Sequence, residues 1–325
     1  MSMLFSPFEI KGVTFRNRVV MAPMVRGLGD AEGRVTDAVV DWYRARAAAG
    51  TGMIIVEATA VDPGGQCWPG GLGAFADEQI PGLRRLAQAI RAEGTVASIQ
   101  LVHGGPQGSP ELCGGEIVGP SAVRVKEGAA LPRMLTVEEI QAIEGRFADA
   151  AARCVEAGFQ AVEIHGAHGF LLDSFLLKAR NARSDDYGGL LPHRARMLVE
   201  TCRRVRERLG SAALLDCRIS IFNKIDEDFT ANDLHCLVGS LVNTGLDLLH
   251  VSTNGVFKGY FNLPKPIGAW VKDITPLPLI VAGGLGLPDN AERALEEGLA
   301  DFAAVGSAMR DDPEWTAHAR AALGG

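Results

Sequence analysis

Two histidines follow a short apolar run near the middle of the chain. The run Ala161–His165 leads into His165-Gly166-Ala167-His168-Gly169, which places the two imidazoles close together among small neighbours. An imidazole can donate a hydrogen bond to a substrate oxygen or transfer a proton near neutral pH. A metal site is a weaker alternative, because no carboxylate or cysteine follows at a convincing ligand spacing. A lone histidine is more often structural, but this pair predicts a catalytic role for His165 and His168.

Two glycine turns near the C-terminus are candidates for binding phosphate. Ala282-Gly283-Gly284 and Val305-Gly306-Ser307 each end a short apolar run. Glycine lets the backbone approach a ligand closely, and backbone N–H groups bind phosphate oxygens. Ordinary turn chemistry explains either segment alone, since glycine is common in this chain. Together the two turns predict a phosphate site at Gly283, Gly284, Gly306 and Ser307.

Short β-prone runs alternate with longer amphipathic stretches through almost the whole chain. The predicted strands are Arg18–Ala22, Gly52–Glu57, Val96–Leu101, Ala161–His165, Leu214–Ile219, Leu248–Ser252, Leu279–Ala282 and Phe302–Val305. Predicted helices include Leu83–Ala92, Val137–Ala157, Arg194–Leu209, Ala231–Thr244 and Asn290–Glu297. Alternating strands and helices form parallel sheets, and eight such strands close into a barrel. The sequence therefore predicts an α/β fold, a (β/α)8 or TIM barrel, as a single domain over residues 1–325.

Two longer segments interrupt this alternation. Residues 102–136, after the third strand, are rich in glycine and proline and show no clear helix. Residues 253–276 form a second excursion, after the sixth strand. Barrel active sites are built at the carboxyl ends of the strands, where the seventh and eighth loops frequently bind phosphate. We therefore expect the histidine pair, the glycine turns and both excursions at one face of the barrel.

Composition excludes several classes of protein. The 325 residues are 47% hydrophobic and 22% charged with a net charge of −7, which is typical of a globular protein and not of a nucleic-acid binder. The six cysteines form no CxxC or CxxH pair, so zinc ribbons and iron–sulfur clusters lack their ligands. No signal-peptide core or bilayer-spanning run occurs. These features predict a cytoplasmic protein without a metal, nucleic-acid or membrane partner.

Several segments resemble one known family along nearly the whole chain. They are LFSPFEIKGVTFRNRVVMAPM, IIVEATAV, SIQLVHGG, VEIHGAHGFLLDSFLLKARNARSDDYGG, CRIS, LPLIVAGGL and DFAAVGSAMRDDPEW. The most specific of them combines the histidine pair with Asn181, Arg183, Asp185 and Tyr187-Gly188-Gly189. In these segments the chain resembles the Old Yellow Enzyme family of FMN-dependent oxidoreductases.

The resemblance implies a site for the flavin ring. Pro23 and Met24 are implied to contact the flavin, with Val25 beside its reactive face. Ala58 and Gln100 are implied to meet the pyrimidine side of the ring. The domain is accordingly expected to bind FMN.

The resemblance also implies how charge is stabilised at the site. Arg218 is implied to lie near N1 and the C2 carbonyl of the flavin, where a positive charge favours the reduced, anionic ring. The phosphate is implied to lie on the same two glycine turns. His165 and His168 are implied to bind the carbonyl oxygen of an α,β-unsaturated substrate, which stabilises the enolate that develops as hydride arrives.

Four residues depart from the family's pattern. Phe170 stands where the family usually has the tyrosine that protonates the substrate, and a phenyl ring has no proton to give. Gly27 stands where relatives often have a substrate-contacting tyrosine, and Val25 where they have cysteine or threonine. Ser307 stands where the family has an arginine to the phosphate. Compensation by water or by another arginine is one explanation, and a changed reaction is the other.

The favoured function is reduction of an activated C=C bond, with NADPH or NADH as the reductant of FMN. Loss of the tyrosine leaves open a flavin-dependent isomerase, desaturase or amine oxidase/demethylase, and a third alternative is a catalytically inactive barrel that acts as a binding protein. The expected partner is a small α,β-unsaturated carbonyl compound in a pocket with Gly27, Phe170 and Tyr260, and Trp68 is a further candidate to line it. No additional cofactor domain is expected, and a homo-oligomer is left open.

Overall fold

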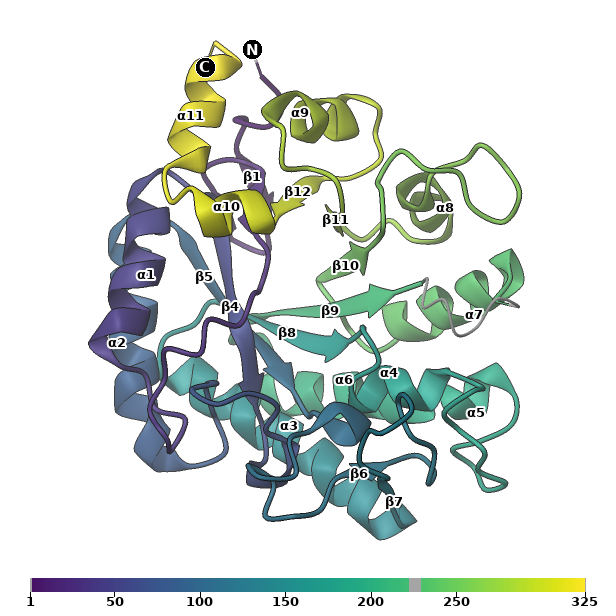
Figure 1. The fold of residues 1–325 in the computed structure, drawn as a ribbon. Coiled ribbons are helices and arrows are strands. Elements are labelled where there is room, and N and C mark those ends of the chain that lie inside the picture. Colours follow the sequence, from purple (N-terminus) through teal and green to yellow (C-terminus); the bar gives the residue numbers. More distant parts are fainter. Residues whose placement is uncertain (1, 222–228, 325) are drawn as a thin grey trace.

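The centre of the molecule is a closed barrel of parallel strands. The computed structural model describes residues 2–221 and 229–324. Around the barrel the strands follow the order β10-β11-β12-β3-β4-β5-β8-β9 (Figure 1). They are β3 (Val19–Met21), β4 (Met53–Ala60), β5 (Val96–Val102), β8 (Ala161–Gly166), β9 (Leu214–Ser220), β10 (Leu248–Ser252), β11 (Leu279–Ala282) and β12 (Phe302–Val305). All eight match predicted strands to within three residues at either end, so the predicted TIM barrel is confirmed.

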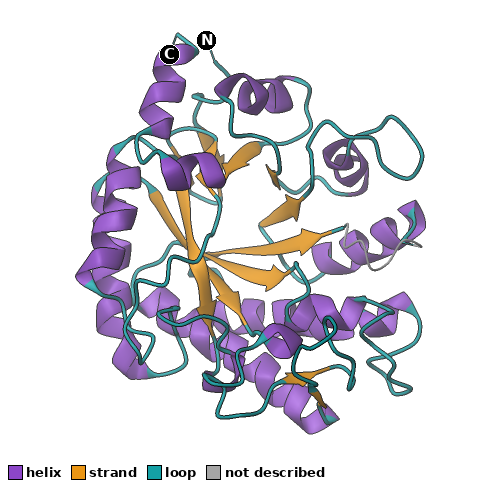
Figure 2. Cartoon of the chain, in the orientation of Figure 1, coloured by secondary structure: helices purple, strands orange, loops and turns teal. Residues whose placement is uncertain are grey.

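Helices cover the outside of the barrel (Figures 1 and 2). They are α1 (Asp37–Ala48), α2 (Ile80–Ala92), α3 (Val137–Glu156), α4 (Leu171–Leu176), α5 (Leu191–Arg194), α6 (Arg196–Leu209), α7 (Ala231–Val242), α8 (Ile267–Ile274), α9 (Pro288–Glu296), α10 (Ser307–Asp311) and α11 (Trp315–Ala322). Their inner faces are apolar, as the fully buried Leu83, Leu86 and Ile90 of α2 illustrate. None of the helices in the described part of the chain is both long and apolar enough to cross a membrane.

Local sequence explains where one of the longest helices begins. The Thr136 side chain accepts a hydrogen bond from the Glu139 N–H, and the Glu139 carboxylate accepts one from the Thr136 N–H. This capping box satisfies two N–H groups that the first turn would otherwise leave unpaired. It fixes the start of α3, which packs against β5 and β8.

The inside of the barrel changes from apolar to polar along its axis. Side chains alternate along a strand, so every second residue of each strand points inward. At the amino ends the inward residues are apolar and pack against a hairpin of β1 (Phe8–Ile10) and β2 (Val13–Phe15). The Phe15 and Phe302 rings lie with centroids 5.0 Å apart, so the hairpin plugs this end. Towards the carboxyl ends the inward positions become polar.

Three features differ from the sequence predictions. The β1–β2 hairpin was not predicted, because strands of three residues are too short to show clear alternation. Strand β4 continues to Ala60, three residues beyond its predicted end. Residues 253–276, predicted as an excursion, contain the helix α8, whose eight residues were obscured by the glycines and prolines that precede them.

The excursion after the third strand is present as predicted. Residues 102–136 form a 3-10 turn at Gly105–Gln107 and two short strands, β6 (Val118–Gly119) and β7 (Arg133–Met134), joined by loops (Figure 2). The N–H of Leu171 donates to the carbonyl of His103, which holds the start of this excursion against the segment that follows the histidine pair. The excursion therefore borders the carboxyl end of β8.

Candidate active site

A cleft of about 410 Å³ opens at the carboxyl ends of the strands. Its lining includes the predicted cofactor residues Pro23, Met24, Arg218, Gly283, Gly284, Gly306 and Ser307. It also includes Ser252 and Thr253, which follow from the end of β10. Residues far apart in the sequence thus meet in one cleft, as expected for loops at a single face of a barrel.

The two glycine turns form one wall of this cleft. Gly283 has a φ of 138°, and a Cβ there would stand 2.1 Å from the Thr253 carbonyl oxygen. A Cβ on Gly306 would lie 3.4 Å from the Sδ of Met24. Among the described residues, the N–H groups of Gly284 and Gly306 have no hydrogen-bond acceptor. Open N–H groups on a backbone that excludes side chains are suited to an anion such as phosphate.

Neither of the two arginines considered as substitutes for the family's arginine at position 307 is free of an acidic partner. Arg310 instead pairs with Asp311, with Nε 2.8 Å from Oδ1. Arg293 pairs with Glu297 and lies over the Phe257 ring, 4.1 Å from its centroid. In this arrangement the backbone of the turns supplies the binding groups.

Arg218 supplies a buried positive charge to the cleft. Its Nη2 donates to the Oγ of Ser252 at 3.3 Å, while its Nε is buried and has no partner among the described residues. Burial lowers the pKa of the guanidinium and the nearby Glu163 carboxylate opposes that effect. A buried cation with an open donor is suited to a carbonyl oxygen or an anionic ring edge. This donor and the glycine wall therefore fit the flavin that the sequence resemblance implies.

The histidine pair lies beside Arg218 at the end of β8. The His165 and His168 ring centroids are 5.2 Å apart, and Nε2 of His168 lies 2.9 Å from the Ser252 Oγ. His168 has a φ of 61°, and its N–H donates to the Ser220 Oγ at 2.9 Å. The Nδ1 of His165 is buried without a partner among the described residues. Residues of β9 and β10 therefore hold His168, while His165 keeps a ring nitrogen without a partner in the described part of the chain.

Desolvation favours the neutral form of both imidazoles. Burial lowers the pKa of His165 well below its usual value, and the neighbouring His168 and Arg218 lower it further. The same desolvation, together with Arg218, lowers the pKa of His168. A neutral imidazole still donates one N–H, so the pair can bind a substrate oxygen without carrying charge.

Aromatic rings continue from the histidine pair. The Phe170 ring lies 5.0 Å from that of His165 and packs edge-on against Trp68 at 5.5 Å. Ala58 lies beside Trp68 at the end of β4 and is almost fully buried. Phe170 and Trp68 form an apolar surface without a proton donor other than the indole N–H.

Three further predicted site residues, Val25, Gly27 and Tyr260, are not among the residues that line this cleft. Gly27 is exposed, has a φ of 66°, and would place a Cβ 3.1 Å from the Pro69 carbonyl oxygen. Val25 is partly buried on the same segment. Tyr260 is buried, and its hydroxyl contacts the Oγ1 of Thr253, which lines the cleft.

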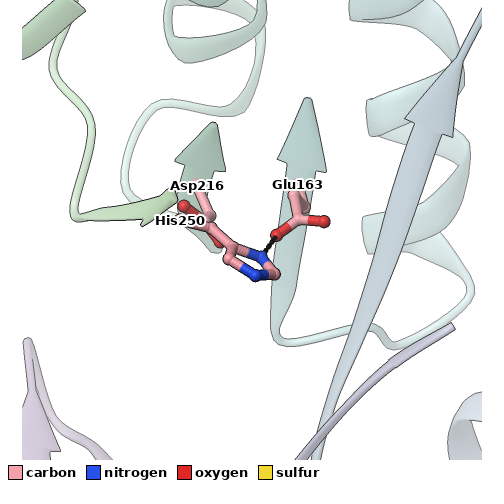
Figure 3. Close-up of side chains that lie close together, drawn as sticks. All are labelled: Glu163, Asp216 and His250. Atoms are coloured by element: carbon pink, nitrogen blue, oxygen red, sulfur yellow. Dashed lines mark hydrogen bonds and ion pairs between the residues drawn. The ribbon is translucent and has the colours of Figure 1, made fainter. Parts of the chain in front are cut away.

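A buried polar layer lies inside the barrel, one inward position below the histidines. Gln100 belongs to it, with its Nε2 donating to Oε1 of Glu163 at 2.7 Å. Glu163 also contacts His250, and Asp216 lies beside them (Figure 3). Sequence reasoning found Gln100 but missed Glu163, Asp216, His250 and also Ser252. Alternation would have revealed them, because each lies two residues from another inward-facing residue on its strand.

Comparison with known sequences covers almost the whole chain. The family described as "NADH:flavin oxidoreductase / NADH oxidase family" matches residues 3–324. An NADPH dehydrogenase of Geobacillus sp. is 35% identical over 328 residues, which cover 99% of this chain and 95% of that protein. An NADH oxidase of Thermoanaerobacter brockii is 34% identical over 329 residues, which cover 98% of this chain and 50% of that protein. The chain thus spans about half the length of the second relative and nearly all of the first.

Solved structures agree with this assignment. Morphinone reductase is 27% identical and superposes with a TM-score of 0.89, covering 99% of this chain and 90% of that one. The Old Yellow Enzyme homologue of Zymomonas mobilis is 26% identical with a TM-score of 0.85, covering 95% of this chain and 90% of that one. The chain belongs to the NADH:flavin oxidoreductase family, that of the Old Yellow Enzymes, and is a flavin-dependent oxidoreductase built on a TIM barrel.

Proposed function

We propose that this protein binds FMN and reduces the C=C bond of an α,β-unsaturated carbonyl compound, with NADPH or NADH as the reductant. The observation that carries the proposal is the neutral pair His165 and His168 beside the buried cation Arg218. Two uncharged N–H donors next to a positive charge are suited to an oxygen that becomes negative during a reaction.

The cofactor would be held by residues on both sides of the cleft. Gly283, Gly284, Gly306 and Ser307 would bind the phosphate through the turns described above. Arg218 would face N1 and the C2 carbonyl of the ring. The ring itself would rest on Pro23, Met24 and Val25, with Ala58 and Gln100 on its pyrimidine side. Bound FMN would accept a hydride from the nicotinamide and deliver it to the β-carbon of the substrate.

The histidines would orient and activate the substrate. Each ring would donate one N–H to the carbonyl oxygen, as neutral imidazoles with lowered pKa values can. These bonds draw electron density away from the β-carbon and strengthen as the enolate forms. Phe170 and Trp68 would pack against the apolar part of the substrate and keep water from one side of it.

Protonation of the α-carbon would fall to water, because Phe170 has no exchangeable proton. The same observation favours a second candidate, a flavin reaction that needs no such proton donor, such as isomerisation, desaturation or amine oxidation. Replacing Phe170 with tyrosine tests whether proton delivery limits enone reduction. Faster enone reduction by Phe170→Tyr is expected if protonation limits the rate, and an unchanged rate would place the donor elsewhere.

The central test is spectroscopic. Purified protein supplied with FMN should show a protein-bound flavin spectrum, which NADPH or NADH should bleach without oxygen. Cyclohexenone should then restore the oxidised spectrum. Reduction without reoxidation by a panel of enones would favour the second candidate, and absence of FMN binding would exclude both. His168→Ala is expected to slow reoxidation by enone while leaving bleaching by the nicotinamide largely intact.

A further inference from the structure

Two fully buried carboxyl groups lie side by side inside the barrel, below the cleft. Glu163 on β8 and Asp216 on β9 are register partners, point inward and are completely buried. One oxygen of each lies within 4.8 Å of the other and of a ring nitrogen of His250 (Figure 3). Two negative charges at this distance repel each other strongly in a medium of low dielectric constant. Only one of the two carboxyls is therefore ionised at a time.

The hydrogen bonds show which carboxyl is ionised. Glu163 accepts from Gln100 Nε2 at 2.7 Å on one oxygen and contacts His250 Nδ1 at 2.6 Å on the other. Both oxygens of Asp216 are buried, and no side-chain donor meets hydrogen-bond geometry with them among the described residues. The groups that act on this carboxyl are the adjacent Glu163, the Cys217 backbone N–H and Arg218. Of two carboxyls that face each other, the one with the stronger side-chain donors is the carboxylate, and the other keeps the proton that they share. The charge therefore resides on Glu163 and the proton on Asp216.

The surrounding groups support this assignment. Burial raises the pKa of Glu163, but His250 opposes it and the net shift is downward. Burial and the Glu163 charge raise the pKa of Asp216 well above its usual value. Arg218 on β9 is a cation that acts on both carboxyls, and burial lowers the pKa of His250, although the Glu163 charge opposes that effect. His165 on β8 also faces this layer and is neutral, while Cys217 points to the outer side of β9.

Glu163 also fixes the orientation of Gln100. A carboxylate can only accept hydrogen bonds, so the amide must turn its Nε2 towards Glu163. The Gln100 carbonyl oxygen is thereby left to accept a bond from another group. Arg218 offers a donor from a strand on the other side of Glu163. A donor and an acceptor held together match the pyrimidine edge of a flavin, which carries both a carbonyl and an N–H.

We propose that Glu163 and Asp216 share one proton, held by Asp216, and that Glu163 is a positioning residue that sets the charge and the hydrogen-bond pattern at the pyrimidine edge of the flavin. This inference rests on the proposed FMN site. The single negative charge of Glu163 partly neutralises Arg218. Glu163 thus lowers the potential at which bound FMN is reduced and orders Gln100 for binding.

The test compares two isosteric variants with a neutral control. Glu163→Gln removes the charge and should raise the FMN midpoint potential, with at least a tenfold change in the equilibrium constant for reduction, about 30 mV for a two-electron couple. It should also weaken FMN binding, measured by flavin fluorescence. Asp216→Asn replaces a neutral group and should leave the potential near the wild-type value. Ser98→Ala, at a buried inward position of β5, is the control for loss of a polar atom without loss of charge.

A second readout needs no flavin. The infrared spectrum of the apoprotein near neutral pH should contain a buried carboxylic acid C=O band that Asp216→Asn removes. Presence of this band in a protein that binds no FMN would exclude the proposed function and leave the shared proton intact. The proposal is overturned if Asp216→Asn raises the potential as much as Glu163→Gln, if the band is absent, or if the purified protein holds one equivalent of a divalent metal that Asp216→Asn releases.

Discussion

The two ends of the barrel each carry a cavity of similar size, but their charged groups are arranged differently. The cavity at the amino ends has about 470 Å³ and includes Lys11, Arg206 and Asp247 in its lining. There the Asp247 carboxylate pairs with both cations, and Arg206 also donates to the Gly245 carbonyl. In the cleft at the carboxyl ends, by contrast, Arg218 Nε has no partner among the described residues.

This difference shows that volume alone does not identify a site. Polar groups at the amino end stabilise one another and the turns around them, so that the fold itself uses their hydrogen bonds. Polar groups at the carboxyl end include buried donors that have no acceptor within the described residues. Such donors destabilise the fold unless a ligand accepts their hydrogen bonds. The following variants test the contrast, from the largest expected effect to the smallest.

Arg218→Met should cause the largest loss of ligand binding. It removes a buried charged donor, and such hydrogen bonds contribute about 1.5–3 kcal/mol, so FMN affinity should fall about ten- to a hundredfold. Fluorescence titration of apoprotein with FMN measures this. Circular dichroism controls for folding, because Glu163 loses its countercharge. FMN affinity equal to the wild type in a folded variant would contradict the role of the carboxyl-end cleft.

Arg206→Met should affect stability and leave FMN binding unchanged. It deprives the buried Asp247 of one of its two cations, which should lower the free energy of unfolding by about 2 kcal/mol. Urea unfolding measures the loss, and the FMN titration serves as the control. A change in FMN affinity at this distance would show that the two ends are not independent.

A matched pair of glycines separates backbone strain from ligand binding. Gly284 and Gly298 have φ values of 77° and 67°, and a Cβ at either would meet no atom within 4 Å. Alanine at each should therefore cost about 1 kcal/mol of stability through the left-handed backbone alone. Only Gly284→Ala should also weaken FMN binding, because its Cβ would enter the phosphate wall. Equal FMN affinities for the two variants would argue against that wall.

Glu57 lies outside the phosphate turns, and its substitution should alter only the pH dependence of stability, without a loss of FMN binding. Its Oε2 accepts from the Arg26 N–H at 2.9 Å, but its Oε1 is buried without a partner, and burial raises its pKa to about 7. Between pH ~4 and about 7 the folded protein keeps a proton on Glu57 that the unfolded chain releases. The free energy of unfolding therefore decreases as the pH rises through this range. Between pH 5 and 8 the free energy of unfolding of Glu57→Gln should decrease by about 1–2 kcal/mol less than that of the wild type. Urea unfolding at each pH measures this difference. Parallel pH curves for the two proteins would contradict this.

Sequence reasoning predicted the elements whose hydrophobic pattern repeats along the chain. It was least successful for features that depend on contacts between residues far apart in the sequence. The eight strands were found because each is an apolar run followed by a turn. The hairpin β1–β2 and helix α8 were missed because short elements show too little periodicity. The polar layer of Glu163, Asp216 and His250 could have been inferred from alternation, but its proton could not. That inference needs distances between strands far apart in the sequence.

Tyr260 illustrates the same limit. Its position after the sixth strand predicts a place in the pocket, and its hydroxyl contacts Thr253, which lines the cleft, but its own side chain is not part of the cleft lining. A loop residue's approximate neighbourhood follows from strand order, whereas the direction of its side chain follows from packing. For the same reason, the contact between Trp68 and Phe170 emerges only from the folded chain.

The hairpin that covers the amino end of the barrel has a consequence for how ligands enter and leave. Side chains fill the barrel and the hairpin covers its amino end, so a molecule reaches Arg218 only through the cleft at the carboxyl ends of the strands. Reductant and substrate of the proposed reaction would then take turns, and each in excess would block the other.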